Sequence, residues 1–272
     1  MAQPGTAQAW KACFRKDFWV QIPASALIFT METWNKFWKS KGSKMEWNQE
    51  DILKSKSLKE YKNLIQNHFN KKNLSSLTLL ELGSGMGITS YYFANEGIKV
   101  TLLDQSKEVK SLAKKFWKNR QFQFIQSDLF KYNSKERFDI ITSFGLCEHF
   151  TGKKRTTALQ LHVNLLKNKG LAIISVPYKY GIFYRIYKAL AELTGQWDFG
   201  IEVPFSKSEL IQFAKDNHLN YELHLSGFYS SAYDLIRKPF KLFKINIKRR
   251  FDSNRSFLDN YLGPSIILVL KK

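Results

Sequence analysis

"LLELGSGMGITSYYFANEGIKVTLLD", residues 79–104, places three glycines at alternate positions between apolar runs. A glycine inside a helix or strand costs roughly 0.5–1 kcal/mol relative to alanine. Gly83, Gly85 and Gly87 therefore indicate a loop whose backbone something must approach closely. The flanking patterns predict a buried strand before the glycines, then a helix, then a second strand that ends at Asp104.

The rest of the chain continues this alternation. Strands that alternate with helices are typical of a doubly wound, parallel α/β sheet. Ser206 followed by Glu209 predicts a capping box at the start of the last long helix. The expected strands are 77–83, 98–104, 122–128, 138–145, 171–177, 221–228 and 265–272, and the expected helices are 46–70, 88–97, 106–119, 156–170 and 206–219.

Composition indicates a globular protein with an anionic partner. The 272 residues are 44% apolar, and the net charge is +20. Such a charge attracts nucleic acid, a membrane surface or an acidic protein, although a generally lysine-rich composition would produce it too. The two cysteines, Cys13 and Cys147, form neither a disulfide framework nor a zinc site, which favours the cytoplasm. No run reaches the ~20 apolar residues of a membrane-spanning helix.

Shifts in composition suggest the domain organisation. Residues 1–30 are expected to be a non-core extension, with a secretory signal as the alternative. Residues 31–73 begin with a methionine, the expected true start of the chain, and predict an N-terminal helical cap. The main domain is expected over residues 74–272. It carries two insertions, at 178–205 and 229–263.

Three acidic residues lie at the ends of expected strands, on the edge where such sheets bind ligands. Glu81 precedes the glycines and could bind an ammonium group, Asp104 could accept ribose hydroxyls, and Asp128 ends the third strand near an adenine. A phosphate loop is excluded because no lysine follows the glycines, and the G-x-G-x-x-G spacing of dinucleotide sites is not matched. An ordinary strand-to-helix turn remains the alternative. Three carboxylates disfavour a pyrophosphate and suit a cationic, phosphate-free adenosine.

The segments "ELGSGMG", "VTLLDQS", "QSDLF", "FDIITSFGLCEHF" and "GLAIISVP" together resemble the class I S-adenosylmethionine-dependent methyltransferases, closely over residues 74–177. The resemblance implies a Rossmann-like sheet of seven strands with the last antiparallel and helices on both faces. It implies S-adenosyl-L-methionine as cofactor, with the glycines around its methionine part. The implied cofactor-binding residues are Glu81, Gly83, Ser84, Gly85, Gly87, Asp104, Gln105, Asp128, Leu129 and Phe144.

The segment after the fourth strand narrows the acceptor. "SFGLCEHF" lacks the [D/N]-P-P-[Y/F] motif of enzymes that methylate base amino groups. It resembles small-molecule enzymes, including quinone-type O-methyltransferases. Some of those place an acid three residues before the Glu and bind a divalent metal, but that position is Gly145 here, so no metal is predicted. His149, with an ordinary pKa near ~6.5, is the candidate general base, or else a histidine that holds the loop.

Residues 178–205 follow the fifth strand and are expected to roof the substrate. Tyr178, Tyr184 and Trp197 are the candidate acceptor contacts, which predicts a lipophilic or ring-containing acceptor. A helical stripe within this insertion is expected to be mostly core packing; its members are Ile182, Phe183, Ile186, Tyr187 and Leu190.

Residues 229–263 interleave cations with large apolar residues. This pattern suits an anionic membrane surface, an RNA backbone or an ordinary solvated face. The favoured function is a small-molecule methyltransferase in the cytoplasm, peripheral on the inner membrane face. An RNA- or protein-modifying methyltransferase is the alternative, with nucleic acid the less favoured partner, and a non-catalytic binding module ranks third. The sequence does not predict the oligomeric state.

Overall fold

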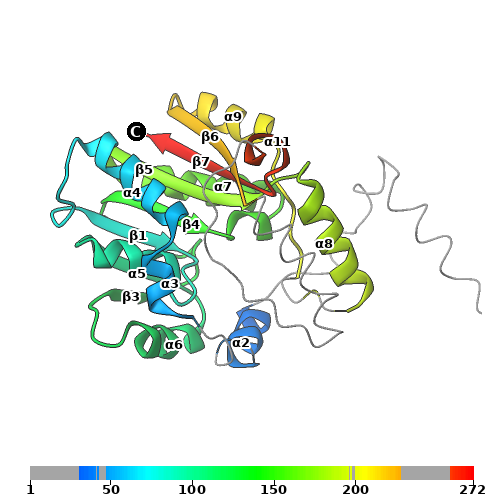
Figure 1. The fold of residues 1–272 in the computed structure, drawn as a ribbon, viewed down its shortest axis with the longest axis horizontal. Helices are drawn as coiled ribbons and strands as arrows, with labels where there is room; N and C mark the ends of the chain where they lie inside the picture. Colours follow the sequence, from blue (N-terminus) through cyan, green and yellow to red (C-terminus); the bar gives the residue numbers. More distant parts are fainter. Residues whose placement is uncertain (1–30, 41, 43–46, 196, 198–199, 228–257) are drawn as a thin grey trace, which may run out of the picture.

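The computed structural model describes residues 31–40, 42, 47–195, 197, 200–227 and 258–272. Their centre is one seven-stranded sheet with the order β3-β2-β1-β4-β5-β7-β6 (Figure 1). This order confirms the predicted doubly wound α/β fold. The strands are β1 Thr78–Leu82, β2 Lys99–Asp104, β3 Gln123–Gln126, β4 Phe138–Phe144, β5 Leu166–Pro177, β6 Asn220–Ser226 and β7 Ser265–Lys271.

Strand directions determine where a ligand can bind. β1 pairs in parallel with β2 and β4, β2 pairs in parallel with β3, and β4 pairs in parallel with β5. Only β7 runs the other way, antiparallel to both β5 and β6, as the resemblance implied. The carboxyl ends of β1 to β5 therefore meet at one edge, which is the ligand-binding edge of such sheets.

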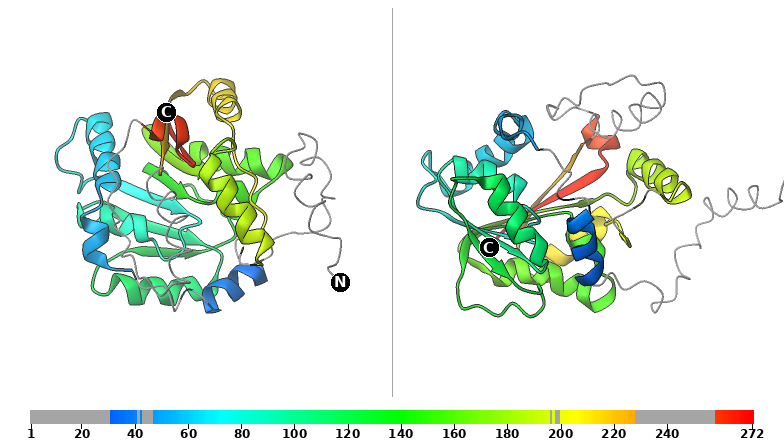
Figure 2. Two further views of the ribbon diagram at one scale, coloured as in Figure 1. Left: turned by 45° about the vertical axis from the view of Figure 1, so that its right-hand side comes forward. Right: turned by 90° about the horizontal axis from the view of Figure 1, so that it is seen from below.

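Helices cover both faces of the sheet (Figures 1 and 2). Side chains alternate along each strand, so that Leu79 and Ile140 join one core layer while Leu80 and Ile141 join the other. α4, α5 and α6 pack on the first layer, and α7 and α9 pack on the second. The helices are α2 Met31–Ser40, α3 Gln49–Leu53, α4 Lys56–Phe69, α5 Ile88–Asn95, α6 Lys107–Trp117, α7 Gly152–Asn164, α8 Ile182–Leu193, α9 Lys207–Asp216 and α11 Asp259–Leu262, with a 3-10 turn, η3, over Cys147–His149.

The expected helix over 156–170 was wrong at its carboxyl end. α7 stops at Asn164, and β5 already begins at Leu166, which pairs with Phe138 of β4. Lys169 has a φ of 63°, and the register shifts where Phe138 gives way to Ile140. Sheet pairing therefore overrides the helical pattern here, through an irregularity at the start of β5.

The capping box before α9 is half formed. The Ser206 hydroxyl accepts a hydrogen bond from the Glu209 backbone N–H at 3.1 Å, as predicted. The Glu209 carboxylate does not reach back to the helix start. It accepts two hydrogen bonds from Arg155 instead, at 2.6 and 3.1 Å, and so ties α9 to α7.

The apolar stripe expected to pack in the core of the first insertion was wrong for three of its members. Ile182, Ile186 and Leu190 of α8 are 53%, 43% and 50% exposed. The opposite side of the helix faces the protein and buries Lys188 and Ala191. α8 stands apart from the helices that flank the sheet (Figures 1 and 2).

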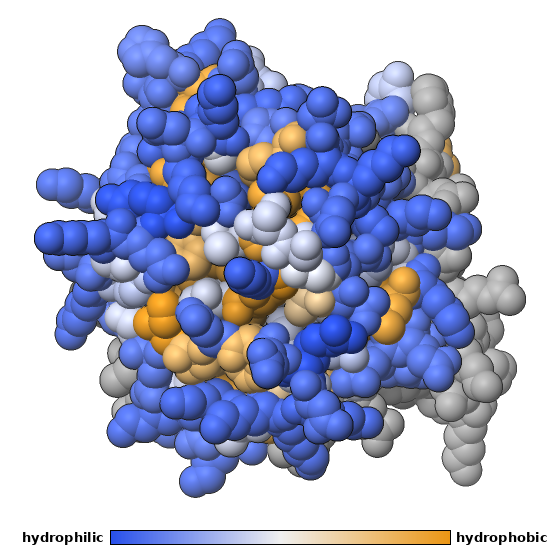
Figure 3. Space-filling model, turned by 90° about the vertical axis from the view of Figure 1, so that its left-hand side faces the viewer, coloured by the Kyte–Doolittle hydropathy of each residue, from blue (hydrophilic) through white to orange (hydrophobic). Residues whose placement is uncertain are grey.

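Some sequence predictions lie outside the described residues. These are the extension over 1–30 and most of the basic insertion, 229–257. The domain boundaries at 31–73 and 74–272 remain predictions, although α3 and α4 pack into the same core as α5. None of the described helices is both long and apolar enough to cross a bilayer. The face on the left of Figure 1 carries mainly hydrophilic side chains, with apolar residues gathered in its lower middle part (Figure 3).

Candidate active site

The glycine loop joins β1 to α5 in a conformation that only glycine adopts without strain. Gly83, Gly85 and Gly87 have φ values of 60°, 51° and 67°, all in the left-handed region. A side chain at each position would also meet a neighbour: a Cβ would lie 2.5 Å from Leu146 at Gly83, 2.8 Å from Trp38 at Gly85, and 2.6 Å from Leu102 at Gly87. The three glycines are thus required both by backbone shape and by close packing.

The neighbours of these glycines partly match the sequence analysis. Gly87 lets the start of α5 pack against Leu102 of β2, which is a close approach to the backbone of the kind that the glycines indicated. At Gly85 the close neighbour in this structure is Trp38 of α2, a residue that the sequence analysis did not single out. α2 therefore lies directly over the glycine loop.

Asp104 ties the end of β2 to the glycine loop. Its Oδ2 accepts a hydrogen bond from the Gly85 N–H at 2.9 Å, and its Oδ1 accepts one from the Ser106 N–H at 2.8 Å. The side chain is buried, and burial raises the pKa of its carboxyl group. Glu81, in β1, is also buried, and burial raises its pKa to about 7. Two carboxyl groups therefore flank the loop in a poorly solvated setting.

The other expected cofactor residues lie along the same edge of the sheet. Ser84 is buried, and its N–H donates to the Leu103 carbonyl at 3.0 Å. Gln105 follows β2 directly and is partly exposed, and Asp128 lies just beyond β3 and accepts a hydrogen bond from the Phe130 N–H at 2.8 Å. The remaining two are Leu129, buried in the second core layer, and Phe144, the last residue of β4.

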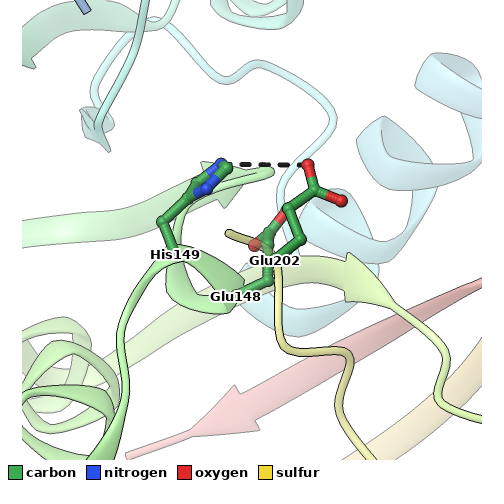
Figure 4. A group of neighbouring side chains, drawn as sticks. All are labelled: Glu148, His149 and Glu202. Atoms are coloured by element: carbon green, nitrogen blue, oxygen red, sulfur yellow. Dashed lines mark ion pairs between the residues drawn. The ribbon is translucent and has the colours of Figure 1, made fainter. Parts of the chain in front are cut away.

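A second acidic cluster lies beyond the end of β4, where Glu148, His149 and Glu202 come together (Figure 4). One donor atom from each lies within 4.8 Å of the others. Glu148 and His149 come from the η3 turn, and Glu202 comes from the segment before α9. Sequence reasoning missed Glu202, because nothing in its local pattern "GIEVPF" marks it as a neighbour of a residue so distant in the chain.

A hydrogen bond to Nδ1 determines the tautomer of His149. Nδ1 lies 3.1 Å from the carbonyl oxygen of Ile201, which can only accept, so Nδ1 carries a proton. Nε2 faces Glu202 Oε1 at 4.0 Å (Figure 4). Burial lowers the pKa of His149 to about 4. The imidazole is therefore neutral near pH 7, with the unprotonated nitrogen Nε2 on the side of Glu202, whereas an ordinary pKa was expected from the sequence.

The two carboxyl groups of the cluster differ in their surroundings. Glu148 is 2% exposed, and its Oε2 has no hydrogen-bond partner among the described residues. Burial raises the pKa of Glu148 to about 8, and the nearby Glu202 contributes to this increase. The Tyr184 hydroxyl donates a hydrogen bond to Glu202 Oε2 at 2.7 Å. Burial raises the pKa of Glu202 as well.

The donor set also suits a divalent cation, since two carboxylates and a neutral imidazole are common metal ligands. Glu202 supplies, from a distant segment, the second acid that the sequence lacks at Gly145. A Cβ at Gly145 would lie 3.4 Å from Glu148 Oε1, so the glycine leaves room beside that carboxylate. The absence of a metal therefore stays a prediction.

The expected acceptor contacts separate into two groups. Tyr184 bonds Glu202, and its ring lies 6.4 Å from that of Trp197, whose Nε1 donates to the Gly200 carbonyl at 2.7 Å. Tyr178 instead forms a bridge with Phe205, and its ring lies 5.7 Å from that of Tyr180. Tyr184 and Trp197 thus belong to the acidic cluster, whereas Tyr178 lies toward the start of α8.

Helix α2 connects the glycine loop with the acidic cluster. Asn35 Oδ1 accepts a hydrogen bond from the Ser106 hydroxyl at 2.7 Å, next to Asp104. The Trp34 ring packs edge-on against His149 at 5.1 Å between centroids. Together with Trp38 over Gly85, these contacts make α2 a wall shared by both halves of the site.

Part of the chain matches a known protein family, and several curated proteins are similar to it. Residues 79–170 match the family model described as "Methyltransferase domain". Among curated proteins, the ubiquinone biosynthesis O-methyltransferase of Rickettsia akari (strain Hartford) is 25% identical over 182 residues, 64% of this chain and 69% of the relative. That of Rickettsia bellii (strain OSU 85-389) is 26% identical over 161 residues, 58% of this chain and 63% of the relative. The chain thus spans 63% to 69% of the length of these relatives.

Solved structures support the fold. Magnesium protoporphyrin IX methyltransferase from Synechocystis PCC 6803, with bound S-adenosylhomocysteine, has a TM-score of 0.55 at 14% identity, covering 89% of this chain and 99% of that chain. A plantazolicin methyltransferase, in complex with a pentazolic desmethylplantazolicin analogue and S-adenosylhomocysteine, has a TM-score of 0.55 at 17% identity, covering 89% and 95%. The matched residues and the strand order together show that the chain contains a class I S-adenosylmethionine-dependent methyltransferase domain.

Proposed function

We propose that this methyltransferase acts on a hydroxyl group of a small, lipophilic or ring-containing acceptor. The observation that carries the proposal is the buried, neutral His149, whose Nε2 faces Glu202 at 4.0 Å beyond the end of β4. A lone pair in that position can accept the proton of a hydroxyl. The aromatic rings of Trp34, Tyr184 and Trp197 near this cluster favour an apolar acceptor.

The cofactor is proposed to lie along the carboxyl ends of β1 to β4. The glycine loop would hold its methionine part, Asp104 its ribose hydroxyls, and Asp128 with Leu129 would border its adenine. Asp104 accepts hydrogen bonds from the backbone N–H groups of Gly85 and Ser106, and the Gln105 N–H also favours its ionised form. An ionised carboxylate offers about four acceptor sites, so acceptor capacity remains for a ribose hydroxyl. The other proposed contacts are Glu81, Ser84, Gln105 and Phe144.

When bound, S-adenosylmethionine supplies a methyl group that is already electrophilic, so the residues of the chain need only to position the acceptor and receive its proton. As the hydroxyl oxygen bonded the methyl carbon and the bond from that carbon to the sulfonium sulfur broke, leaving a neutral thioether, the hydroxyl proton would pass to His149 Nε2. Glu202 Oε1 then stabilises the imidazolium ion, and the Tyr184 hydroxyl holds Glu202 in place. The surrounding aromatic side chains limit access of water.

The relatives support the class of acceptor. Two are named for O-methylation in ubiquinone biosynthesis, and the solved neighbours are named for a porphyrin and for plantazolicin. All of these names fit ring-containing molecules. A lipophilic acceptor would also explain a location in the cytoplasm at the inner face of a membrane, which remains part of the proposal.

Transfer of a labelled methyl group to extracted small molecules and lipids tests the proposal. His149→Ala should lower turnover by roughly 10²–10⁴-fold with cofactor affinity unchanged, because only the proton acceptor is lost. His68→Ala, at a partly exposed histidine on α4 that contacts the Lys169 carbonyl, is the matched control. A His149→Ala enzyme that retains more than about half of the rate would refute the assigned role.

A chelator should leave the rate unchanged. Loss of activity in the chelator, reversed by Mg²⁺, would show instead that Glu148, His149 and Glu202 hold a metal.

The alternative acceptor is RNA or protein, and the net charge of +20 is the observation that favours it. The same labelling experiment separates the two readings. Label recovered in RNA or protein, with none in the small-molecule fraction, would replace the proposed acceptor.

A further inference from the structure

One side of α8 exposes a continuous apolar surface. Ile182, Ile186, Leu190 and Leu193 are 53%, 43%, 50% and 68% exposed. Their spacing of four, four and three residues places them on one side of the helix. Tyr180, just before α8, is 57% exposed as well. We refer to these five residues as the α8 surface.

The orientation of α8 is held from its other side. Lys188 is 8% exposed, its Nζ bonds Glu192 Oε1 at 2.5 Å, and it lies 4.1 Å from the centre of the Trp197 ring. Burying the α8 surface by rotating the helix would break the cation–π contact with Trp197 and the hydrogen bond from Tyr184 to Glu202, because both partners lie outside the helix. The exposure of the apolar residues is therefore a fixed property of the fold.

Cationic side chains border the α8 surface. Arg185 is exposed on α8 next to Ile186, and Lys179 lies 5.9 Å from the centre of the Tyr180 ring. Glu192, the single acidic residue of α8, is already paired with Lys188. Within the described residues, the helix thus presents apolar groups bordered by uncompensated positive charge. That combination is complementary to an anionic lipid surface.

The described residues on either side of the basic insertion lie close to the start of α8. Its described end leads through α11 to Pro264, whose Cα would lie 2.8 Å from a Cβ at Gly181, at the start of α8. The chain between Gly227 and Leu258 carries further cations, among them Lys238, Lys241, Lys244, Lys248, Arg249 and Arg250.

A second copy of the chain is a poorer occupant. A 12-residue helix is about 18 Å long, and one side of it offers roughly 200 Å². A stable protein interface buries about 800 Å² on each partner. A bilayer has no such minimum, because a single amphipathic helix can lie in the headgroup region.

We propose that the α8 surface docks the enzyme reversibly onto an anionic bilayer. The helix lies in the plane of the headgroups, with Arg185 and Lys179 at the phosphate level. Docking would give a lipophilic acceptor a route from the bilayer to the active site, and this part of the inference rests on the proposed function. The docking itself depends on the fold and needs neither cofactor nor acceptor.

Co-sedimentation with phosphatidylcholine vesicles, with and without phosphatidylglycerol, tests the docking on the full chain. The wild type should bind only the anionic vesicles and should be released by high salt. Ile186→Glu combined with Leu190→Glu should weaken binding by at least about tenfold, because two apolar contacts become like-charged with the lipid. Leu53→Glu, at an exposed leucine of α3, is the matched control and should bind as the wild type does.

Circular dichroism and cofactor binding of the double variant test whether it is folded, so that weaker vesicle binding can be distinguished from unfolding. Normal binding of anionic vesicles by the folded double variant would overturn the proposal, as would failure of the wild type to bind them. A wild-type dimer that the double variant abolishes would assign the α8 surface to a second copy. Methyl transfer to acceptor dissolved in detergent is measured separately, so failure of the docking and failure of the proposed function give different results.

Discussion

Replacement of Glu148 by Gln should stabilise the protein at high pH and have little effect at low pH. Glu148 is 2% exposed, and burial raises its pKa from the ordinary 4.5 to about 8. Because the folded state holds the proton more tightly than the unfolded state, this carboxyl lowers stability progressively as pH rises from 4.5 to about 8. A glutamine of nearly the same shape carries no such cost.

The pKa shift sets the size of the effect. Converted in full, the pKa shift corresponds to at most about 5 kcal/mol in the free energy of unfolding. Relaxation around the ionised group reduces the expected difference between Glu148→Gln and the wild type at high pH to about 2 kcal/mol. Glu81, whose pKa is also raised by burial, contributes equally to both proteins and cancels in the comparison.

Urea unfolding at about pH 5 and about pH 9, in a chelator, measures this difference. Glu136→Gln, in the loop before β4, controls for removal of an exposed carboxylate. If Glu148→Gln and the wild type differ by the same amount at both pH values, Glu148 is not a buried acid that ionises at a cost, and the reasoning fails.

Three other predictions follow from the same contacts. Asp104→Ala should weaken cofactor binding at least about tenfold by calorimetry, because charge-assisted bonds of roughly 1.5–3 kcal/mol are lost; unchanged affinity in a folded variant would contradict the ribose assignment. Gly87→Ala should lower the free energy of unfolding, measured in urea, by about 3 kcal/mol. Its φ of 67° is strained for alanine, and the added Cβ would lie 2.6 Å from Leu102. Gly152→Ala, with a φ of 53° and nothing within 4 Å, should cost only about 1 kcal/mol, and equal costs would refute the packing argument. Arg155→Ala should lower stability by about 3 kcal/mol and reduce turnover through Glu202, because Arg155 bonds the Val203 carbonyl at 2.7 Å; normal turnover would exclude this positioning role.

Local patterns in the sequence were enough to predict most of the fold. Apolar runs bounded by glycine and acid identified the strands, and the strand order then confirmed the family resemblance. The spacing of Gly83, Gly85 and Gly87 indicated a loop with an unusual backbone conformation. Positions with positive φ favour glycine, so this conformation is visible in the sequence as glycines. Asp104 was recognisable because its position at a strand end is itself a local feature.

The sequence does not reveal contacts between distant segments. Glu202 reaches His149 only because the segment before α9 returns to the end of β4, where Arg155 holds it. Trp38 lies over Gly85 because α2 crosses the glycine loop, and no periodicity within α2 could show that.

The tertiary structure also decides which side of α8 faces the solvent. A stripe of Ile182, Ile186 and Leu190 predicts an amphipathic helix, and the usual expectation is that the apolar side packs inward. Here Lys188 packs inward against the Trp197 ring, which leaves the apolar side exposed. The sequence by itself determined the strands, most of the helices and the glycine loop, since these depend mainly on neighbouring residues; it did not show that 46–70 divides into α3 and α4 or that α7 ends at Asn164. The tertiary structure decided the acidic cluster and the exposed surface, because both depend on which distant side chains meet a given side of an element.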